Sequence, residues 1–397
     1  MYTKKGVADC IRHFAPAWFA VNMGTGAVSI LFAAFPYGNE TDALNAISAA
    51  FFVLNLILFF IFTTISIMRY TLFPDVWSIM IRHPVQGLYL GTFPMGAATL
   101  IGVGTTVLYG QYGFGGRAFL YTLWGLWWVD VGISVLCCWG VIYIMITEQH
   151  HSLHQMTSVW LLPVVTLIVA SSAGGELAQA LHSYSVTSAL TTVAFSISMV
   201  SVGLVLAFMI LTIYLYRLIL HGFPPGASIF SSFIPLGPMG QAGFSVLLIG
   251  QSLKSFLPVS GSRSSFLGSA QAGENVFALC VCISFFLWAL ATMWLGYALL
   301  GIQRVLRRKR IPFKLSFWGM TFPNGVYANL TINLYRVLDV PFFRVWGAVY
   351  SVFTILLWTA VFCRTISLVR HGKIFEAPCL EVEEISEADN EINSSYP

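Results

Sequence analysis

Ten apolar stretches, each long enough to cross a lipid bilayer, run through this sequence. They lie at about 14–36, 43–68, 85–110, 118–147, 156–181, 185–219, 227–251, 275–303, 315–338 and 343–369. A membrane-spanning helix needs about 20 mostly apolar residues. Only 9% of the 397 residues are charged, whereas a soluble domain carries about 25%. The sequence therefore predicts an all-α membrane protein with ten transmembrane helices and excludes an ordinary soluble enzyme.

The charged residues predict how these helices are oriented. With ten spans, both termini lie on the same side of the membrane, and that side holds 15 of the 20 Lys and Arg residues. Because an excess of Lys and Arg marks cytoplasmic segments, we expect both termini in the cytosol. The predicted parts are a cytosolic N-terminus at 1–13, a transmembrane domain at 14–370 and a solvated, acidic cytosolic tail at 371–397. Asn39, in a predicted outer loop, is a candidate glycosylation site.

Prolines divide the ten spans into two classes. Each odd-numbered span contains a proline, and by these boundaries the interiors of the even-numbered spans contain none. Five prolines spaced 69 to 85 residues apart indicate a helical hairpin repeated five times; they are Pro16, Pro94, Pro163, Pro238 and Pro323. A proline frees a backbone carbonyl group, which within a membrane must be satisfied by protein or by water in a cavity. We therefore expect the odd spans to bend and to line a central path, with the even spans outside them.

The odd spans carry polar side chains but no Lys or Arg in their interiors. An anion on such a path would be held by hydroxyl and amide groups, freed backbone N–H groups and helix dipoles. Nearby phenylalanines are candidates for apolar constrictions that exclude water. The polar residues predicted to line the path are Asn22, Thr25, Thr92, Ser171, Ser172, Gln241, Thr321 and Asn324, with Thr99, Ser245 and Asn329 as further polar residues of these spans, and the phenylalanines are Phe19, Phe93, Phe244 and Phe322.

Two acidic residues lie well inside predicted spans, Asp130 in the fourth and Glu176 in the fifth. A buried carboxylate in a membrane is costly and needs a partner, a proton or water. Either residue is a candidate for carrying a coupling proton. Asp130 also fits a structural hydrogen-bonding role, and Glu176 lies nearer the outer mouth, where water can reach it.

The sequence has no motif for the common energy-coupling or hydrolytic chemistries. It contains no Walker A sequence, HExxH helix, GxSxG elbow or dinucleotide-binding fingerprint. His150, His151 and His154 cluster between spans 4 and 5, but a solvated turn is favoured there over a metal site because only Glu148 accompanies them. We therefore expect no enzyme activity, no cofactor and no metal. The basic residues lie where a membrane protein needs topogenic charges, so the expected partner is the lipid bilayer and not nucleic acid.

The sequence around these prolines resembles the tellurite-resistance/dicarboxylate transporter family, and within it the branch that exports sulfite from fungal cells. The matching segments cover nearly the whole membrane region: 14–16 and 18–26, 91–96, 123–130, 162–165, 236–241 and 317–323. The first is shared with the fungal malate permeases, and the last two are more similar to the sulfite branch. The family is related to the slow-type anion channels of plant guard cells.

This resemblance implies a homotrimer in which each protomer has its own pore, with five inner helices surrounded by five outer ones. It also implies that a phenylalanine of the ninth helix occludes the pore. The matching residue here is Phe322, beside Pro323, with Phe317 as the second choice. The fifth span departs from the family pattern, since the segment from Leu162 to Val165 is aliphatic.

The function implied is export of sulfite or hydrogen sulfite across the plasma membrane, which would detoxify sulfite. An anion leaving a cell that is negative inside gains about 2.3 kcal/mol per charge per 100 mV. Channel-like or uniport conduction would then suffice, with Phe322 as the gate and Asn22, Thr25, Gln241 and Asn324 replacing water around the anion. The alternative is a proton-coupled malate or dicarboxylate transporter, in which Asp130 or Glu176 would matter.

Overall fold

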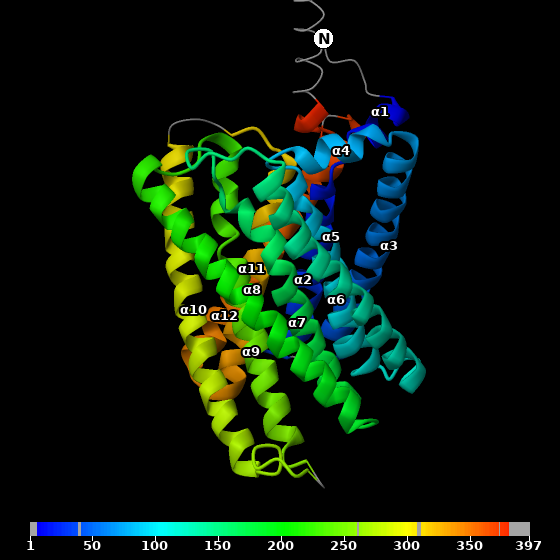
Figure 1. Ribbon diagram of the computed structural model, residues 1–397, viewed down its shortest axis with the longest axis vertical. Helices are drawn as coiled ribbons and strands as arrows, with labels where there is room; N and C mark the ends of the chain where they lie inside the picture. Colours follow the sequence, from blue (N-terminus) through cyan, green and yellow to red (C-terminus); the bar gives the residue numbers. More distant parts are fainter. Residues whose placement is uncertain (1–5, 39–40, 260–261, 308–310, 373, 381–397) are drawn as a thin grey trace, which may run out of the picture.

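The computed structural model describes residues 6–38, 41–259, 262–307, 311–372 and 374–380. All regular structure in these residues is helical (Figure 1). The long helices are α2 (Phe19–Ala34), α3 (Asp42–Leu72), α5 (Thr92–Val103), α6 (Gly116–Thr147), α7 (Leu162–Leu181), α8 (Val186–His221), α9 (Leu236–Phe256), α10 (Ala270–Leu306), α11 (Thr321–Leu338) and α12 (Pro341–Arg370). The short ones are α1 (Val7–Arg12), α4 (Asp75–Arg82), a π-helical turn η3 (Gly104–Tyr109) and the 3-10 segments η1 (Pro16–Trp18), η2 (Gly87–Gly91), η4 (Ser158–Leu161), η5 (Gly226–Phe233) and η6 (Leu315–Met320). The candidate glycosylation site Asn39 lies outside the described residues.

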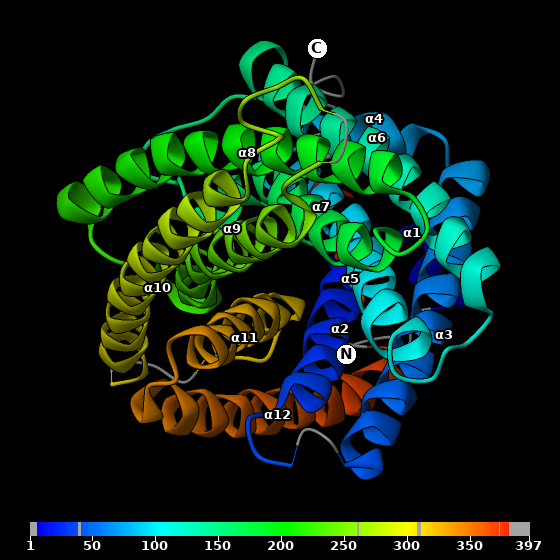
Figure 2. The same ribbon diagram turned by 90° about the horizontal axis from the view of Figure 1, so that it is seen from below.

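An inner ring of helices is surrounded by an outer layer of helices (Figure 2). Around the ring, α2 contacts α5, α5 contacts α7, α7 contacts α9, α9 contacts α11, and α11 closes the ring on α2. Each inner helix also packs on the outer helix that follows it in the chain: α3, α6, α8, α10 and α12, respectively. In the membrane-capable segments, 78–94% of the inner-helix residues are buried, against 17–33% of the outer-helix residues. The outer helices therefore shield the ring and present apolar side chains outward.

Nine helical segments of the described chain are long and apolar enough to cross a membrane. They correspond to nine of the ten predicted spans, and the all-helical fold is confirmed. The remaining predicted span, 315–338, consists of η6 and α11, which form a continuous part of the inner ring. This segment is not one of the nine helical segments that are long and apolar enough to cross a membrane. It carries three asparagines, Asn324, Asn329 and Asn333.

The prolines of the odd spans do not bend the middle of the inner helices, as the sequence suggested. Each inner segment begins with a 3-10 turn and continues as α-helix. Pro16 opens η1, Pro163 is the second residue of α7, and Pro94, Pro238 and Pro323 are the third residues of α5, α9 and α11. In the first turn of a helix the missing proline N–H would have no intrahelical partner in any case. Four of these prolines therefore mark the 3-10 to α junction of an inner helix, and Pro16 marks the start of the 3-10 turn before α2.

The chain beyond α12 packs back against the bundle. Residues 374–380, called the C-terminal strap, lie at the same end as α1 and α4 (Figure 1). Ile374 is buried in the aromatic cluster at the start of the first inner helix. Ala377, Cys379 and Leu380 are buried against α4. The prediction of a solvated tail is therefore wrong for this strap, because its apolar side chains find a groove. The rest of the predicted tail, from residue 381, lies outside the described residues.

Candidate functional site

Three cavities follow one another along the inner ring. The first, the termini-side vestibule, has a volume of about 350 Å³ and lies between the starts of the inner segments. The second, the constriction, has a volume of only about 20 Å³. The third, the far-side vestibule, has a volume of about 800 Å³ and lies at the other ends of the inner helices. The helices α2, α7, α9 and α11 line both vestibules, and the remaining inner segment lines the first through α5 and the third through η3. The two vestibules therefore lie at opposite ends of the inner ring.

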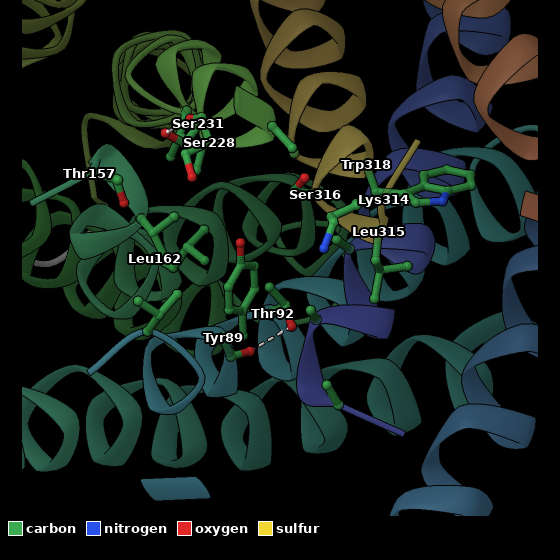
Figure 3. A pocket seen from close by; sticks show the side chains of 18 of the residues that line it. Tyr89, Thr92, Thr157, Leu162, Ser228, Ser231, Lys314, Leu315, Ser316 and Trp318 are labelled. Carbon is green, nitrogen blue, oxygen red and sulfur yellow. Dashed lines mark hydrogen bonds between the residues drawn. The ribbon is translucent and has the colours of Figure 1, made fainter. Parts of the chain in front are cut away.

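The termini-side vestibule is lined mainly by apolar groups, with hydroxyl groups placed around it (Figure 3). These hydroxyl groups come from different inner segments: Tyr89, Thr92, Thr157, Ser228, Ser231 and Ser316. The hydroxyl of Thr92 donates to the carbonyl oxygens of Pro16 (2.9 Å) and Tyr89 (2.7 Å), so it also ties two inner segments together. Lys314 and Glu376 are the two charged residues among the described lining residues.

The constriction is too small for an oxyanion. A cavity needs roughly 10–15 Å³ to hold one water molecule, so a volume of about 20 Å³ admits about one. Its wall is formed by Ala27, Ile30, Ala98, Thr99, Gly102, Val169, Ser172, Ala173, Glu176, Gln241, Phe244, Phe322, Gly325, Val326 and Asn329. Small residues allow the helices to approach closely here: a Cβ atom on Gly325 would lie 2.7 Å from the Cβ atom of Ala27. In this conformation the constriction is therefore closed to an oxyanion.

Phe322 lies at the boundary between the first two cavities. It lines both the termini-side vestibule and the constriction, and it alone among the described lining residues does so. Its side chain is 4% exposed. At the other end, Phe244 lines both the constriction and the far-side vestibule. One phenylalanine thus stands at each end of the narrow segment, and Phe322 separates it from the vestibule near the termini.

Polar groups reach the constriction from several helices. Gln241 of α9 donates a hydrogen bond from its side-chain nitrogen to the Ser172 hydroxyl, which in turn donates to the Val169 carbonyl oxygen (2.8 Å). Thr99 donates to the Gly96 carbonyl oxygen (2.8 Å). The hydroxyl groups of Ser172 and Thr99 thus donate to the backbone, and Gln241 lines the constriction with its side-chain amide.

The far-side vestibule contains charged groups of both signs. Asp42, Glu176 and Arg336 line it. Glu176 also lines the constriction, and its carboxylate fills the space beside Gly102, since a Cβ atom there would lie 2.5 Å from Oε2. Arg336 donates to the Ala34 carbonyl oxygen at the end of α2 (3.1 Å). The carboxyl group predicted to carry a proton is therefore on the path, at the narrow end of this vestibule.

Five of the eight polar residues predicted to line the path point into helix interfaces. Asn22 donates to the backbone and side-chain oxygens of Asn55 on α3 (3.1 and 2.9 Å). Ser171 donates to the Ser196 carbonyl oxygen on α8 (2.7 Å). These hydrogen bonds tie the inner ring to α3 and α8, although Oδ1 of Asn22 has no hydrogen-bond partner in the described part of the chain. Neither residue lines any of the three cavities.

The other three such residues lie on α2 and α11. The Thr25 hydroxyl accepts a hydrogen bond from the Trp358 indole on α12 (3.1 Å). Asn324 accepts one from the Tyr350 hydroxyl (2.5 Å), also on α12. Thr321 occupies the space that a side chain on residue 24 of α2 would need. The structure thus keeps Thr92, Ser172 and Gln241 as cavity-lining residues from the predicted set and places the rest between helices.

Three of the five predicted gate phenylalanines do not line any of the three cavities. Phe19 and Phe93 stack edge to face (5.1 Å between ring centres) and both pack on Phe59 of α3. Phe317 packs against Phe230 (3.9 Å) and Phe313 (4.7 Å). These contacts turn all three rings toward neighbouring helices and turns, where they stabilise the bundle.

Asp130 does not lie on the path. It is 3% exposed, and neither carboxyl oxygen has a hydrogen-bond partner in the described part of the chain. It lines none of the three cavities described above. Of the predicted histidine cluster, His151 is hydrogen-bonded to Gln149 (2.8 Å).

Sequence reasoning missed the role of Lys314 in lining a vestibule, because this lysine was counted only as a topogenic charge. The sequence position of Lys314 could have indicated this role, because it lies directly before η6, where an inner segment begins. Thr99 and Asn329, expected as further polar residues of the odd spans, also line the constriction.

The sequence matches known proteins over nearly the whole bundle. A sequence model of the voltage-dependent anion channel family matches residues 13–366. The chain is 37% identical to the sulfite efflux pump of Trichophyton rubrum over 356 residues, which is 90% of this chain and 91% of that protein. The sulfite efflux pump of Arthroderma benhamiae matches with the same identity and coverage. The malic acid transport protein of Schizosaccharomyces pombe is 21% identical over 350 residues, 88% of this chain and 76% of that protein.

Proposed function

The chain belongs to the voltage-dependent anion channel family, and on this premise we propose that it exports sulfite or hydrogen sulfite from the cell. The family resemblance of the sequence motifs is confirmed by the match to residues 13–366. Two relatives at 37% identity are named as sulfite efflux pumps, and they cover 90% of the chain. Export of this kind would detoxify sulfite.

The observation that carries the mechanism is the line of three cavities interrupted at Phe322. The anion enters the termini-side vestibule, passes Phe322 and leaves through the far-side vestibule. In this proposal η6 and α11 form a tenth span, so that five helical hairpins surround one pore in each protomer. The termini are cytosolic, the protein resides in the plasma membrane, and three copies assemble as a homotrimer.

Phe322 acts as the gate because a ring at the edge of so small a space excludes both water and a hydrated ion. When the ring moves, Gln241 and Ser172 can replace water around the oxyanion. No Lys or Arg is present among the described residues that line the constriction, so the anion is bound weakly there and is released quickly. Weak binding at the narrow point favours conduction over retention.

The membrane potential is sufficient to drive this export. A singly charged anion leaving a negative cell interior gains about 2.3 kcal/mol per 100 mV, which corresponds to about a 50-fold concentration ratio. No coupled ion is required. Channel-like or uniport conduction therefore accounts for efflux, and the protein needs no nucleotide.

Glu176 supports a second candidate function, proton-coupled transport of a dicarboxylate such as malate. A carboxylate at the boundary between the constriction and the far-side vestibule repels a passing anion unless it is protonated or displaced. A relative named as a malic acid transport protein shares 21% identity. This candidate requires transport to depend on a proton gradient.

The test uses purified protein in liposomes loaded with sulfite or with malate. A membrane potential and a pH gradient are imposed in separate experiments. We expect the potential alone to accelerate sulfite release while malate is retained. Malate movement that depends on the pH gradient, with no sulfite release under potential, would refute sulfite export and support the dicarboxylate transporter.

A further inference from the structure

The mouth of the termini-side vestibule is bordered by the C-terminal strap. Its residues Ile374, Glu376 and Pro378 line the vestibule, although they follow the last helix of the bundle. Ile374 is also buried in the aromatic cluster at the start of the first inner helix, and Ala377, Cys379 and Leu380 are buried against α4. In addition, Phe375 stacks on Trp18 with 5.4 Å between ring centres. These apolar contacts hold the strap in place and leave Glu376 facing the opening.

Glu376 meets Lys314 at this opening. The Lys314 ammonium lies 2.8 Å from Oε2 of Glu376, and the two side chains are 48% and 44% exposed. Figure 3 shows Lys314 extending toward the middle of the pocket, opposite Tyr89. No other charged side chain lines the vestibule among the described residues. Among the described residues that line the vestibule, the single cationic side chain is therefore already paired with a carboxylate supplied by the strap.

We propose that Lys314 captures the anion entering the vestibule and that Glu376 occupies Lys314 as a tethered competitor. The inference rests on the proposed function, since it takes sulfite or hydrogen sulfite as the anion. A carboxylate and a sulfite ion present the same feature to an ammonium group, a negatively charged oxygen that accepts a charge-assisted hydrogen bond. Glu376 therefore stands where the substrate would stand at the first step of entry.

The exposure of the pair makes this competition reversible. An ion pair with both side chains about half exposed is screened by water and salt and contributes little to folding stability. Exchange of Glu376 for an anion from solution costs little for the same reason. The strap itself need not leave, because its apolar residues anchor it on both sides of Glu376. The Glu376 carboxylate therefore sets the anion concentration at which half of the Lys314 sites hold an anion.

A simpler role for the pair is to fasten the strap. If that were all, removal of either charge would release the same contact, and Lys314→Gln and Glu376→Gln would change transport in the same direction. The capture role predicts opposite directions. Glu376→Gln frees the lysine and lowers the concentration of anion needed for half-maximal flux, whereas Lys314→Gln removes the capturing group and raises it.

The experiment measures initial sulfite flux against sulfite concentration on the termini side, in proteoliposomes with oriented protein. The energies of exposed charge pairs correspond to factors of about 1.5 to 5 in an equilibrium constant. We expect Glu376→Gln to lower the apparent KM for sulfite by a factor in this range and Lys314→Gln to raise it similarly. The maximal flux stays the same in both. The double variant is expected to resemble Lys314→Gln, and the shifts are expected to shrink at high salt.

Glu148→Gln is the matched control. Glu148 pairs with Arg82 at 3.3 Å, with both side chains at least half exposed, but it does not line the vestibule. We expect no change in the apparent KM. The proposal is overturned if the wild-type protein transports sulfite and the two variants, Lys314→Gln and Glu376→Gln, shift the apparent KM equally in the same direction. It is overturned likewise if neither variant shifts the apparent KM. A wild-type protein that conducts chloride but no sulfite would instead refute the proposed substrate, and opposite shifts measured with chloride would still support capture by Lys314.

Discussion

Replacement of Phe322 with alanine tests where the path closes. The ring separates a vestibule of about 350 Å³ from a constriction of about 20 Å³. Its removal joins the two spaces and lets water from the vestibule advance to Gln241. A buried phenylalanine side chain represents about 1.5–3 kcal/mol of apolar surface kept from water. If the barrier to the anion falls by the same amount, flux rises by a factor of about 10 to 150.

The same geometry predicts a moderate loss of stability. A phenylalanine removed from a dry core costs about 3–5 kcal/mol, because an empty cavity is left behind. At Phe322 the new space opens to the vestibule and fills with water, so the loss is limited to about 1.5–3 kcal/mol. Phe19 provides the matched control, since it is 3% exposed against 4% for Phe322 and lies in the first turn of another inner helix. Phe19→Ala should cost the full amount and leave flux unchanged.

The assay is sulfite release from proteoliposomes under an imposed potential, combined with thermal unfolding of each purified variant. Phe322→Leu should give an intermediate flux, because its side chain blocks part of the same space. A folded Phe322→Ala protein with wild-type flux would refute the assignment of the gate. An equal increase in Phe19→Ala would show that loosened packing, and not the removal of a gate, raises the flux.

Three further outcomes are expected. Glu176→Gln should abolish any effect of a pH gradient on sulfite flux and leave potential-driven flux in place; a preserved pH response would exclude this carboxyl as the proton carrier. Gly91→Ala should lower stability by about 1–3 kcal/mol in thermal unfolding, because the new Cβ atom would lie 2.7 Å from the Leu162 carbonyl oxygen; an unchanged melting temperature would contradict this packing. Burial lowers the pKa of His83, whose Nδ1 accepts two backbone N–H groups at 3.2 Å. The unfolded chain therefore binds this proton more readily, and stability should fall as the pH drops below about 6.5; His83→Asn, which does not titrate, should lose less stability, and an equal loss in both proteins would refute the linkage.

The positions of the membrane helices could be predicted from the sequence because every span needs a run of apolar residues. Each span must supply enough apolar residues to cross the bilayer, whatever its neighbours are. Nine of the predicted spans were found in this way within the described residues. The recurring prolines also separated the inner from the outer helices. Their structural meaning differed from expectation, because the helices begin at these prolines and do not bend there.

The lining of the path could not be read in the same way. A helix that is buried on nearly all sides shows no polar face toward water, so its sequence does not reveal which side faces the cavity. Ser171 and Ser172 illustrate this, since neighbouring residues on a helix point about 100° apart. The hydroxyl of Ser171 meets α8, whereas that of Ser172 meets Gln241 at the constriction. Both are small, hydroxylated and buried, and only the packing of α7 distinguishes them.

The sequence by itself determined the class of protein, the number and place of most spans and the family to which the chain belongs, because these depend on composition and on local motifs. The tertiary structure decided which side chains meet across the ring. Phe322 borders two cavities while Phe19 is enclosed by aromatic rings, and Glu376 reaches Lys314 although 62 residues separate them. Such contacts join distant segments, so they are fixed by how the helices rotate and pack, and not by the residues of any one segment.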